Sequence, residues 1–495
     1  MGATITFTEN RMRQLYLLIA CLFLLSACLN QDDSSAAPTA VLSACQLTGG
    51  VAAQCGAITV PEDRRATTEN GRTLDIHFAV LPATLSNPEP DPVFMLAGGP
   101  GQAAMSAFPP ILPALQKLNQ SRDIVLVDQR GTGESNPLSC PNVSDLPPDS
   151  TEEMLNEALD MCREELAGSH DLTQYHTTIA MTDLDAVRAA LGYEQINLIG
   201  ISYGSRAALE YMRLFPQRTR SVTLSAVAGP ELVLQLQAPR DGQRALDLFF
   251  ARCAADDACR TTFPNLEQEF AALLEQLNDG VDTTLVHPVT GEVVDLTLNR
   301  DDFMQSIFAL LYSADFVSLL PLLIHNAAES GDFGPILAQT LLFSDSVDLH
   351  QGMFYAVVCS EDAPLIDLDE AAALQAESEF ALVAEDLLAV CANWPRAAVP
   401  GELREAVTAV IPTLLLSGEA DPVTPPQYAD SVAAALPQSL HLIVPGYGHD
   451  VLTVGCMPAV VEAFISSGAV TGLDTACLDE IQPPPFFISP TGPRP

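Results

Sequence analysis

One stretch of the sequence constrains the fold more than any other: residues 195–215, which read QINLIGISYGSRAALEYMRLF. A mostly apolar run predicts a buried strand, and a helix-forming run follows it with no loop between them. At the junction, residues 200–204 read GISYG and fit the pattern G-x-S-x-G. The two glycines allow a tight turn that exposes Ser202, in a strained conformation, at the carboxyl end of the strand. The alternative is an ordinary strand-to-helix turn in which Ser202 has no chemical role.

The strand–turn–helix pattern recurs from residue 50 onward. Residues 181–193 have helical spacing, with Thr182 as the predicted N-cap and Gly192 as the predicted C-cap. Buried apolar runs that alternate with helices predict a parallel sheet with helices on both faces. The runs that predict strands and their turns are residues 57–60, 74–81, 92–101, 122–135, 221–229, 411–426 and 439–450.

Residues 231–400 interrupt this alternation. They contain helical stretches and a predicted hairpin over residues 283–298, which is the pattern of a lid inserted into the fold. The chain therefore divides into six predicted parts: a signal peptide (1–27), a flexible tether (28–44), the first part of the core (45–230), a mostly helical cap (231–400), the last part of the core (401–482) and a loosely packed Pro-rich tail (483–495).

A serine hydroxyl is a poor nucleophile unless a nearby base takes its proton. His449 is the best placed of the eight histidines, because it follows the apolar run of residues 439–444 inside the loop GYGHD. His441 lies within that run, where a packed side chain is expected. The other six histidines lack such a setting: His77, His170, His176, His287, His325 and His350.

The acid that orients this base is predicted to be Asp421, which also follows an apolar run. Glu419 and Asp450 are alternatives. A carboxylate in this role holds the imidazole in place and stabilises its charged form. The chain order Ser202, Asp421, His449 is that of the α/β-hydrolase fold, so the three assignments support one another.

Acyl transfer also needs backbone N–H groups that face the negative oxygen of the tetrahedral intermediate, and one lost donor costs about 2.7–4 kcal/mol. The residue after the nucleophile, Tyr203, supplies one predicted donor. The second is predicted in the loop LAGGPGQ, residues 96–102, where Gly99 lets the backbone approach closely. The alternative is that this loop serves only as the start of a helix.

Six segments, CGAITVPEDR, GGPGQ, VDQRGTGES, GISYGS, GEADPVTPP and GYGH, together resemble the proline iminopeptidase and tripeptidyl aminopeptidase branch of the α/β-hydrolases. The resemblance implies an eight-stranded, mostly parallel sheet, a mostly helical cap, no cofactor, and attack on peptides from their free amino end. It places the nucleophile, acid and base on Ser202, Asp421 and His449. It places the oxyanion donors on Gly99 and Tyr203.

Two positions depart from proline iminopeptidases. Ala97 stands where these enzymes carry histidine before Gly-Gly-Pro-Gly, and Tyr203 stands where they often have tryptophan. The long cap and the many cysteines are more similar to secreted tripeptidyl aminopeptidases. Strict proline specificity is therefore not expected.

An aminopeptidase needs a carboxylate for the ammonium group of its substrate, because a buried unpaired charge is costly. The segment FYAVVCSED resembles part of the secreted relatives and offers Glu361 as this anchor. The alternative is that Glu361 and Asp362 form a solvated acidic pair beside a disulfide. Asp128, Arg130 and Glu134 are predicted to form a structural salt-bridge network under the site.

The N-terminus predicts export. Arg11 and Arg13 precede an apolar run over residues 15–28 that is too short to span a membrane comfortably. The run ends in Leu-Ser-Ala-Cys, which resembles a bacterial lipobox, so Cys28 is the predicted lipid-bearing first residue of the mature protein. Leu29 stands where an inner-membrane retention signal has aspartate, which favours the outer membrane. The alternative is a signal peptide cut after a small residue, with a product in the periplasm or at the cell surface.

Export predicts the state of the cysteines. Removing Cys21 with the signal peptide and assigning Cys28 to the lipid leaves ten of the twelve cysteines. An even number in an oxidising compartment predicts disulfides, and ten cysteines allow many connectivities. Nearest-neighbour pairing gives Cys45–Cys55, Cys140–Cys162, Cys253–Cys259, Cys359–Cys391 and Cys456–Cys477. No C-x-x-C pair occurs, which argues against a zinc or thioredoxin-like site.

The chain carries 22 Lys and Arg against 63 Asp and Glu, a formal net charge of −41. This charge argues against nucleic acid and anionic membrane surfaces as partners, leaves the lipid as the only membrane contact, and favours a monomer. The sequence thus predicts an exported serine hydrolase, without metal or cofactor, that acts on a peptide or small ester. An aminopeptidase is the first interpretation, and a carboxylesterase or lipase on the same fold is the alternative. A binding module without catalysis is a third.

Overall fold

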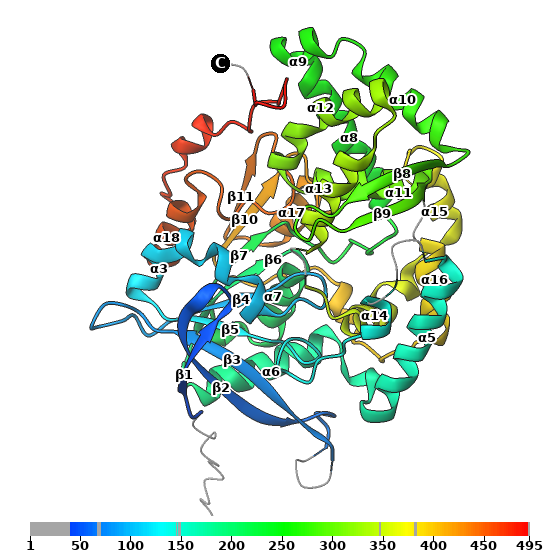
Figure 1. Cartoon of the computed structure of the whole chain (residues 1–495). Coiled ribbons are helices and arrows are strands. Elements are labelled where there is room, and N and C mark those ends of the chain that lie inside the picture. The colour runs from blue at the N-terminus through cyan, green and yellow to red at the C-terminus, as the bar shows by residue number, and fades with distance from the viewer. Residues whose placement is uncertain are drawn as a thin grey trace, which may run out of the picture. The chain divides into compact units, whose positions relative to one another are not determined.

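The computed structural model describes residues 40–66, 71–144, 146, 150–345, 348–380 and 384–493. The predicted signal peptide, Cys28 and the tether as far as residue 39 lie outside these residues. A sheet of nine strands runs through the described chain (Figure 1). No helix in these segments is long and apolar enough to cross a membrane.

The sheet is mostly parallel, as predicted. Its strands in spatial order are β1 (Ser43–Leu47), β2 (Val51–Pro61), β3 (Thr73–Leu81), β5 (Ile124–Val127), β4 (Val93–Leu96), β6 (Ile196–Ile201), β7 (Thr219–Ser225), β10 (Thr413–Gly418) and β11 (Ser439–Val444). The pairings from β1 to β5 are antiparallel, and those from β5 to β11 are parallel. There is one strand more than the eight expected. The extra strand is β1, whose side chains are mostly exposed, so its sequence has no apolar run to predict it.

Helices pack on both faces of the sheet, which confirms the predicted layers. Alternate residues of a strand point to opposite faces, and the apolar core divides in the same way. Phe94 and Leu96 of β4 belong to one cluster, whereas Val93 and Met95 belong to another. The first cluster includes side chains of α5 (Glu152–Ser169), α6 (Thr177–Ala190), α7 (Tyr203–Leu214), α14 (Gln351–Glu361), α16 (Ala384–Asn393) and α17 (Pro426–Ala435), with α4 (Pro141–Ser144) packed beside it. The second includes side chains of α2 (Ala104–Ala107), α3 (Gln116–Ser121) and α18 (Met457–Ser467).

The helices that follow β7 build an apolar core of their own. This cluster is shared by α8 (Ala238–Ala255), α9 (Asp257–Thr262), α10 (Leu266–Leu277), α11 (Arg300–Leu311), α12 (Ala314–Ser330) and α13 (Gly334–Asp345). The next helices differ: α14 and α16 return to the core of the sheet, and α15 (Leu368–Gln375) packs beside α8 and α16. The helices from α8 to α13 therefore form a layer with an apolar core separate from that of the sheet.

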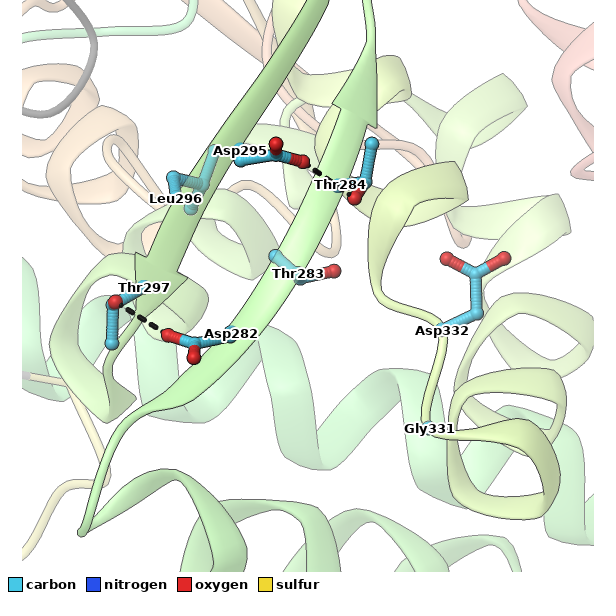
Figure 2. A pocket seen from close by; sticks show the side chains of 8 residues that line it. All are labelled: Asp282, Thr283, Thr284, Asp295, Leu296, Thr297, Gly331 and Asp332. Atoms are coloured by element: carbon cyan, nitrogen blue, oxygen red, sulfur yellow. Dashed lines mark hydrogen bonds between the residues drawn. The ribbon is translucent and has the colours of Figure 1, made fainter.

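The hairpin predicted over residues 283–298 is confirmed as β8 (Val281–Val286) paired antiparallel with β9 (Val293–Leu298). It lines a hollow of ≈ 720 Å³ together with Gly331 and Asp332 (Figure 2). Asp295 accepts a hydrogen bond from Thr284 across the hairpin, and Asp282 accepts one from Thr297, both at 2.8 Å. These two carboxylates therefore brace the strands.

The Pro-rich tail is not loosely packed, so that prediction is wrong for its described residues. Phe486 is 3% exposed and packs edge-on against Phe249 of α8, with ring centroids 6.0 Å apart. The guanidinium of Arg252 lies 4.0 Å from the Phe486 ring centroid. The N–H of Phe487 donates to the carbonyl of Ser318 on α12 at 2.9 Å. The aromatic residues supply the buried apolar area that a purely proline-rich segment lacks.

The start of α6 also differs from the prediction. The helix begins at Thr177, so Thr182 is not its N-cap but lies inside it. His176 occupies the N-cap position and makes no side-chain cap bond. Instead, the carboxylate of Glu361 accepts the N–H of Thr177 at 2.7 Å, from 184 positions away in the chain. Such a distant partner leaves no local signal. The C-cap is Leu191, one residue before the predicted Gly192, and Gly192 follows it with φ of 81°, the left-handed conformation in which glycine commonly ends a helix.

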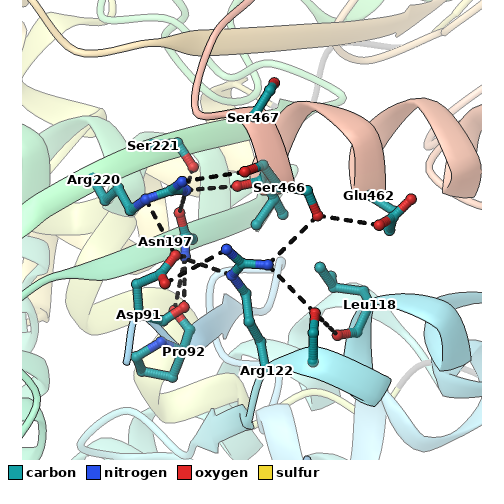
Figure 3. Close-up of polar contacts among 12 residues, drawn as sticks. Asp91, Pro92, Leu118, Arg122, Asn197, Arg220, Ser221, Glu462, Ser466 and Ser467 are labelled. Carbon is teal, nitrogen blue, oxygen red and sulfur yellow. Dashed lines mark hydrogen bonds and ion pairs between the residues drawn. The ribbon is translucent and has the colours of Figure 1, made fainter. Parts of the chain in front are cut away.

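A buried polar network braces the amino ends of the central strands (Figure 3). Asp91, just before β4, accepts hydrogen bonds from Arg122 Nε at 3.0 Å and from Asn197 Nδ2 at 2.9 Å. It also pairs with Arg220 at 3.2 Å, and Arg220 donates to the carbonyl of Ile465 on α18. The network lies at the opposite end of β6 from the G-x-S-x-G turn, so it holds the sheet without occupying the predicted site.

Candidate active site

The turn between β6 and α7 has the strained geometry predicted from the sequence. Ser202 has φ 57° and ψ −126°, and a positive φ is uncommon for a residue with a Cβ. Both glycines are needed because a Cβ at either position would clash with a backbone carbonyl oxygen. A Cβ on Gly200 would lie 2.3 Å from the carbonyl oxygen of Gly204, and one on Gly204 would lie 2.0 Å from that of Leu96. The strained turn is confirmed, and the role of Ser202 as nucleophile stays a prediction.

Asp421 and His449 form a hydrogen-bonded pair. The imidazole Nδ1 of His449, in the loop after β11, lies 2.9 Å from Oδ2 and 3.1 Å from Oδ1 of Asp421, in the loop after β10. The Asp421 carboxylate is fully buried and also accepts the backbone N–H groups of Val423 and Thr424, each at 2.8 Å, and the Thr424 hydroxyl at 2.7 Å. Burial opposes its ionised form, but His449 and these donors outweigh burial and lower the pKa of Asp421.

The alternatives to this pair have other partners. Glu419 accepts the N–H of Gly446 at 2.9 Å, and Asp450 accepts the hydroxyl of Ser225 at 2.7 Å. His441 is packed, as expected, with its two ring nitrogens bonded to Asp430 and Ser417. The carboxylate that the fold brings to His449 is therefore that of Asp421.

Ser202 and His449 line the same cavity, which has a volume of ≈ 620 Å³. The cap forms much of its wall, with Phe308 of α11, Phe343 of α13 and Tyr312 between α11 and α12. Tyr312 also holds the base, because its carbonyl accepts the N–H of His449 at 2.8 Å and the two rings lie 5.0 Å apart. The cap therefore both shapes the cavity and fixes the loop that carries His449.

The cavity wall is largely apolar. Its side chains include Ile201, Phe308, Ala309, Phe343 and Leu349. The polar members are the hydroxyls of Ser202, Ser313, Ser344 and Tyr312, the amides of Gln102 and Gln305, and the imidazole of His449. None of the described residues in this wall is Asp, Glu, Lys or Arg. The cavity therefore suits a substrate group that is apolar or uncharged.

The loop predicted to complete the oxyanion hole lies against the serine. Gly99 lines the cavity with φ of 102°, a conformation that favours glycine, and a Cβ on Gly98 would lie 3.1 Å from Cβ of Ser202. Tyr203 is the first residue of α7, so its N–H has no acceptor within the helix. Both groups stand beside Ser202 in the chain or in space, and their role as oxyanion donors stays a prediction.

Glu361 is not among the residues that line the cavity. Its side chain is buried, and its Oε1 and Oε2 accept the N–H and the hydroxyl of Thr177 at 2.7 and 2.9 Å. Burial raises the pKa of its carboxyl group, against the opposing effect of Arg206. Asp362 is also buried and pairs with Arg206 at 2.9 Å. The solvated acidic pair is therefore wrong, and Glu361 as the ammonium anchor stays a prediction.

The three charged residues of the segment DQRGTGES do not form one network. Arg130 pairs with Asp183 of α6 at 2.6 Å. Asp128 instead accepts the backbone N–H groups of Met105 at 2.9 Å and Glu134 at 3.2 Å. Burial raises the pKa of Asp128 to about 6. The predicted salt-bridge network of these three residues is therefore wrong, because Arg130 and Asp128 belong to two separate sets of contacts; their structural role stays a prediction.

All five predicted disulfides are present, with the nearest-neighbour pairing. They are Cys45–Cys55, Cys140–Cys162, Cys253–Cys259, Cys359–Cys391 and Cys456–Cys477. Disulfides persist in oxidising compartments, so they indicate an extracytoplasmic protein. Among the residues that the structure describes, no group of three or more His, Cys, Asp or Glu side chains could hold a metal ion.

Thr424 and Tyr312 both contact the acid–base pair, and neither was singled out from the sequence. Thr424 donates to Asp421 and lies 3.3 Å from His449 Nδ1. A hydroxyl three residues after the acid, in the same turn, is a signal that could have indicated it. Tyr312 contacts His449 from the cap, and no local pattern in the sequence marks it.

Comparison with known proteins shows the family of the chain. A family model described as alpha/beta hydrolase fold matches residues 91–455. The chain is similar to the serine protease Hip1 of Mycobacterium tuberculosis, at 26% identity over 465 residues, which is 86% of this chain and 87% of that protein. It is also similar to the tripeptidyl aminopeptidase of Streptomyces coelicolor, at 28% identity over 196 residues, 36% of this chain and 35% of that one. Among solved structures, proline iminopeptidase of Mycobacterium smegmatis aligns with 83% of this chain and 98% of its own, at 17% identity and a TM-score of 0.39. The chain therefore belongs to the α/β-hydrolase family of enzymes.

Proposed function

We propose that this enzyme is an exported serine peptidase that removes residues from the free amino end of peptides. The observation that carries the proposal is the cavity shared by Ser202, His449 and Gly99, with His449 bonded to Asp421. The names of two similar proteins, a serine protease and a tripeptidyl aminopeptidase, support a peptide as the substrate.

In this mechanism, Ser202 Oγ attacks the carbonyl carbon of the scissile bond while His449 Nε2 takes the hydroxyl proton. Asp421 stabilises the imidazolium that results, and the N–H groups of Gly99 and Tyr203 receive the oxyanion. The tetrahedral intermediate then collapses: the C–N bond breaks, and His449 passes its proton to the leaving amine. Water, activated by the same imidazole, attacks the acyl group on Ser202 and releases it as a carboxylic acid.

One observation favours the alternative of a carboxylesterase. The cavity wall has no acidic side chain among its described residues, so the ammonium group of an aminopeptidase substrate has no partner of opposite charge there. An esterase that binds a neutral acyl group needs none. The two functions therefore differ in their response to a blocked amino group.

The test uses lipid-free protein that begins at residue 41 and its Ser202→Ala variant. Each is offered a peptide anilide with a free amino terminus, the same anilide N-acetylated, and a short-chain nitrophenyl ester. A preference for the free amine that disappears in Ser202→Ala would establish an aminopeptidase. Equal or faster turnover of the acetylated anilide or of the ester would reject it in favour of an esterase or endopeptidase.

The proposal includes the cellular location of the enzyme. Cleavage after residue 27 and lipidation of Cys28 would attach the protein to the outer membrane, with residues 28–44 as the tether and the enzyme otherwise monomeric. Replacement of Cys28 by serine should release the protein from the membrane fraction of a bacterial host. A Cys28→Ser protein that stays with the outer membrane would reject the anchor.

A further inference from the structure

A chain of buried contacts behind the G-x-S-x-G turn has no role in the proposed mechanism. The phenol oxygen of Tyr203 lies 2.7 Å from Oγ1 of Thr177, the first residue of α6. The Thr177 hydroxyl donates to Oε2 of Glu361 at 2.9 Å. A hydroxyl has one proton, and Thr177 gives it to the carboxylate, so the Tyr203 hydroxyl donates to Thr177. All three side chains are at most 3% exposed.

Glu361 contacts the first turn of α7 by a second route. Its Oε2 lies 3.9 Å from Nη1 of Arg206, three residues after Tyr203. The same guanidinium pairs with Asp362 at 2.9 Å, and Arg404 pairs with Asp362 at 2.8 Å. Two guanidinium groups therefore face two carboxylates, and removal of one member would leave a buried charge unpaired. The cluster joins α6, α14 and the first turn of α7.

We propose that Thr177 and Glu361 are positioning residues, which act through the Tyr203 side chain to aim the Tyr203 backbone N–H at the oxyanion. The inference rests on the proposed function, because it requires acyl transfer at Ser202. It gives Glu361 a role other than holding the substrate ammonium, and its contacts support this, since the carboxylate faces Thr177 and Arg206 and does not line the cavity.

The physical reason is that an oxyanion donor on the backbone cannot be adjusted by a rotamer. Its direction follows the conformation of residues 202 and 203, and the buried phenol is the part of Tyr203 that neighbouring helices can hold. Misplacement of a catalytic group by 1 Å can cost about 100-fold in rate, and loss of one supporting hydrogen bond should cost less, about 10-fold. The loss should appear in kcat and not in KM, because the hydrogen bond from this N–H to the oxyanion forms only in the transition state.

The experiment compares wild type with Tyr203→Phe, Thr177→Val, their double variant and Glu361→Gln. Each is assayed on the free-amine anilide, the acetylated anilide and the nitrophenyl ester. We expect each single variant to lower kcat about 10-fold on every substrate that wild type turns over, with KM within about twofold. The kcat of the double variant should be no lower than that of the more impaired single variant, because both substitutions break the same hydrogen bond.

A second readout uses a fluorophosphonate, which forms a bond from phosphorus to Ser202 Oγ with loss of fluoride and places a phosphonyl oxygen where the oxyanion would be. The rate of labelling should fall in the same variants by a similar factor. The matched control is Thr178→Val, which removes the neighbouring hydroxyl on the same turn of α6, bonded to Glu210 at 2.8 Å. It should label at the wild-type rate. Tyr203→Phe, Thr177→Val and Thr178→Val should unfold within a few degrees of wild type, whereas Glu361→Gln, which removes a charge that faces Arg206, is expected to unfold at a lower temperature.

The outcomes separate the two proposals. Wild-type protein that fails to label at Ser202 would reject the proposed function. Wild type that labels, with Tyr203→Phe and Thr177→Val labelling equally fast, would reject the positioning role alone. An equal loss in Thr178→Val would also reject it, since the effect would then come from the packing of α6. A rise in KM for the free-amine anilide alone in Glu361→Gln would return Glu361 to the role of anchor.

Discussion

Asp421 is the most constrained side chain of the candidate site, since its carboxylate accepts four hydrogen bonds: two from backbone N–H groups, one from Thr424 and one from His449. Asparagine keeps its shape but presents an amide group to the imidazole, which favours the wrong tautomer. We expect Asp421→Asn to lower kcat on the nitrophenyl ester by about 10⁴-fold, with little change in KM. The controls are Asp450→Asn and Glu419→Gln, which should stay active. An active Asp421→Asn beside an inactive control would move the role of acid to that other residue.

The protonation of His449 sets the acidic limb of the pH profile. Burial opposes the charged imidazole, but the Asp421 carboxylate outweighs it, so the pKa of His449 is raised above 6.5. The base must be neutral to take a proton, and a raised pKa keeps it charged to higher pH. Activity is therefore expected to be lost as pH falls through a midpoint above 6.5, measured as kcat/KM on the ester from pH 5 to 9. A midpoint below the ordinary value would contradict the coupling to Asp421.

At the scale of helices and strands, the sequence predicts those elements whose bounds are determined by contiguous residues. The β6–α7 junction is one example, because an apolar run, two glycines and a helix-forming run are contiguous and leave one geometry for Ser202. The start of α6 is the opposite case, because its first N–H is satisfied by Glu361 from another helix. For the same reason the sequence suggests a carboxylate of interest at Glu361 but does not show which group it meets.

The tail is the element whose packing the sequence concealed, and it offers a stability test. Phe486 is buried against Phe249 and Arg252, so Phe486→Ala should lower the free energy of unfolding by about 3 kcal/mol. The measurement is denaturant unfolding followed by the fluorescence of Trp394, the single tryptophan. Phe487→Ala is the matched control, because Phe487 is only partly buried, and it should cost less. Equal stability of wild type and Phe486→Ala would mean that the tail does not brace the cap.

At the scale of the whole chain, the candidate site could be predicted because parallel strands place their carboxyl ends at one edge of the sheet. Ser202, Asp421 and His449 each follow a strand of the parallel part, so a chain-order argument brings them together. The wall of the cavity could not be predicted in this way. Tyr312, Phe308 and Phe343 come from helices of the cap, whose placement over the sheet depends on tertiary packing. Substrate preference therefore depends on the cap helices, whose packing could not be predicted from the sequence.

The net charge of −41 is a property of the whole molecule with a consequence for stability. Self-repulsion among surface carboxylates destabilises the compact state, and salt weakens it because the Debye length falls from about 30 Å at 0.01 M to about 3 Å at 1 M. Buried pairs such as Arg206–Asp362 are screened much less, so the net effect of salt should be stabilising. We expect the melting temperature to rise by several degrees between 0.01 and 1 M sodium chloride.

A triple variant provides the control for this prediction. Glu153, Glu157 and Glu165 lie exposed on α5, and replacing all three with glutamine removes charge without disturbing a described ion pair. The variant should melt higher than wild type at 0.01 M salt, and the gap should close at 1 M, because screening already removes the repulsion there. A melting temperature that falls with salt in both proteins would show that surface ion pairs outweigh repulsion. The acidity would then be a source of stability and not a cost.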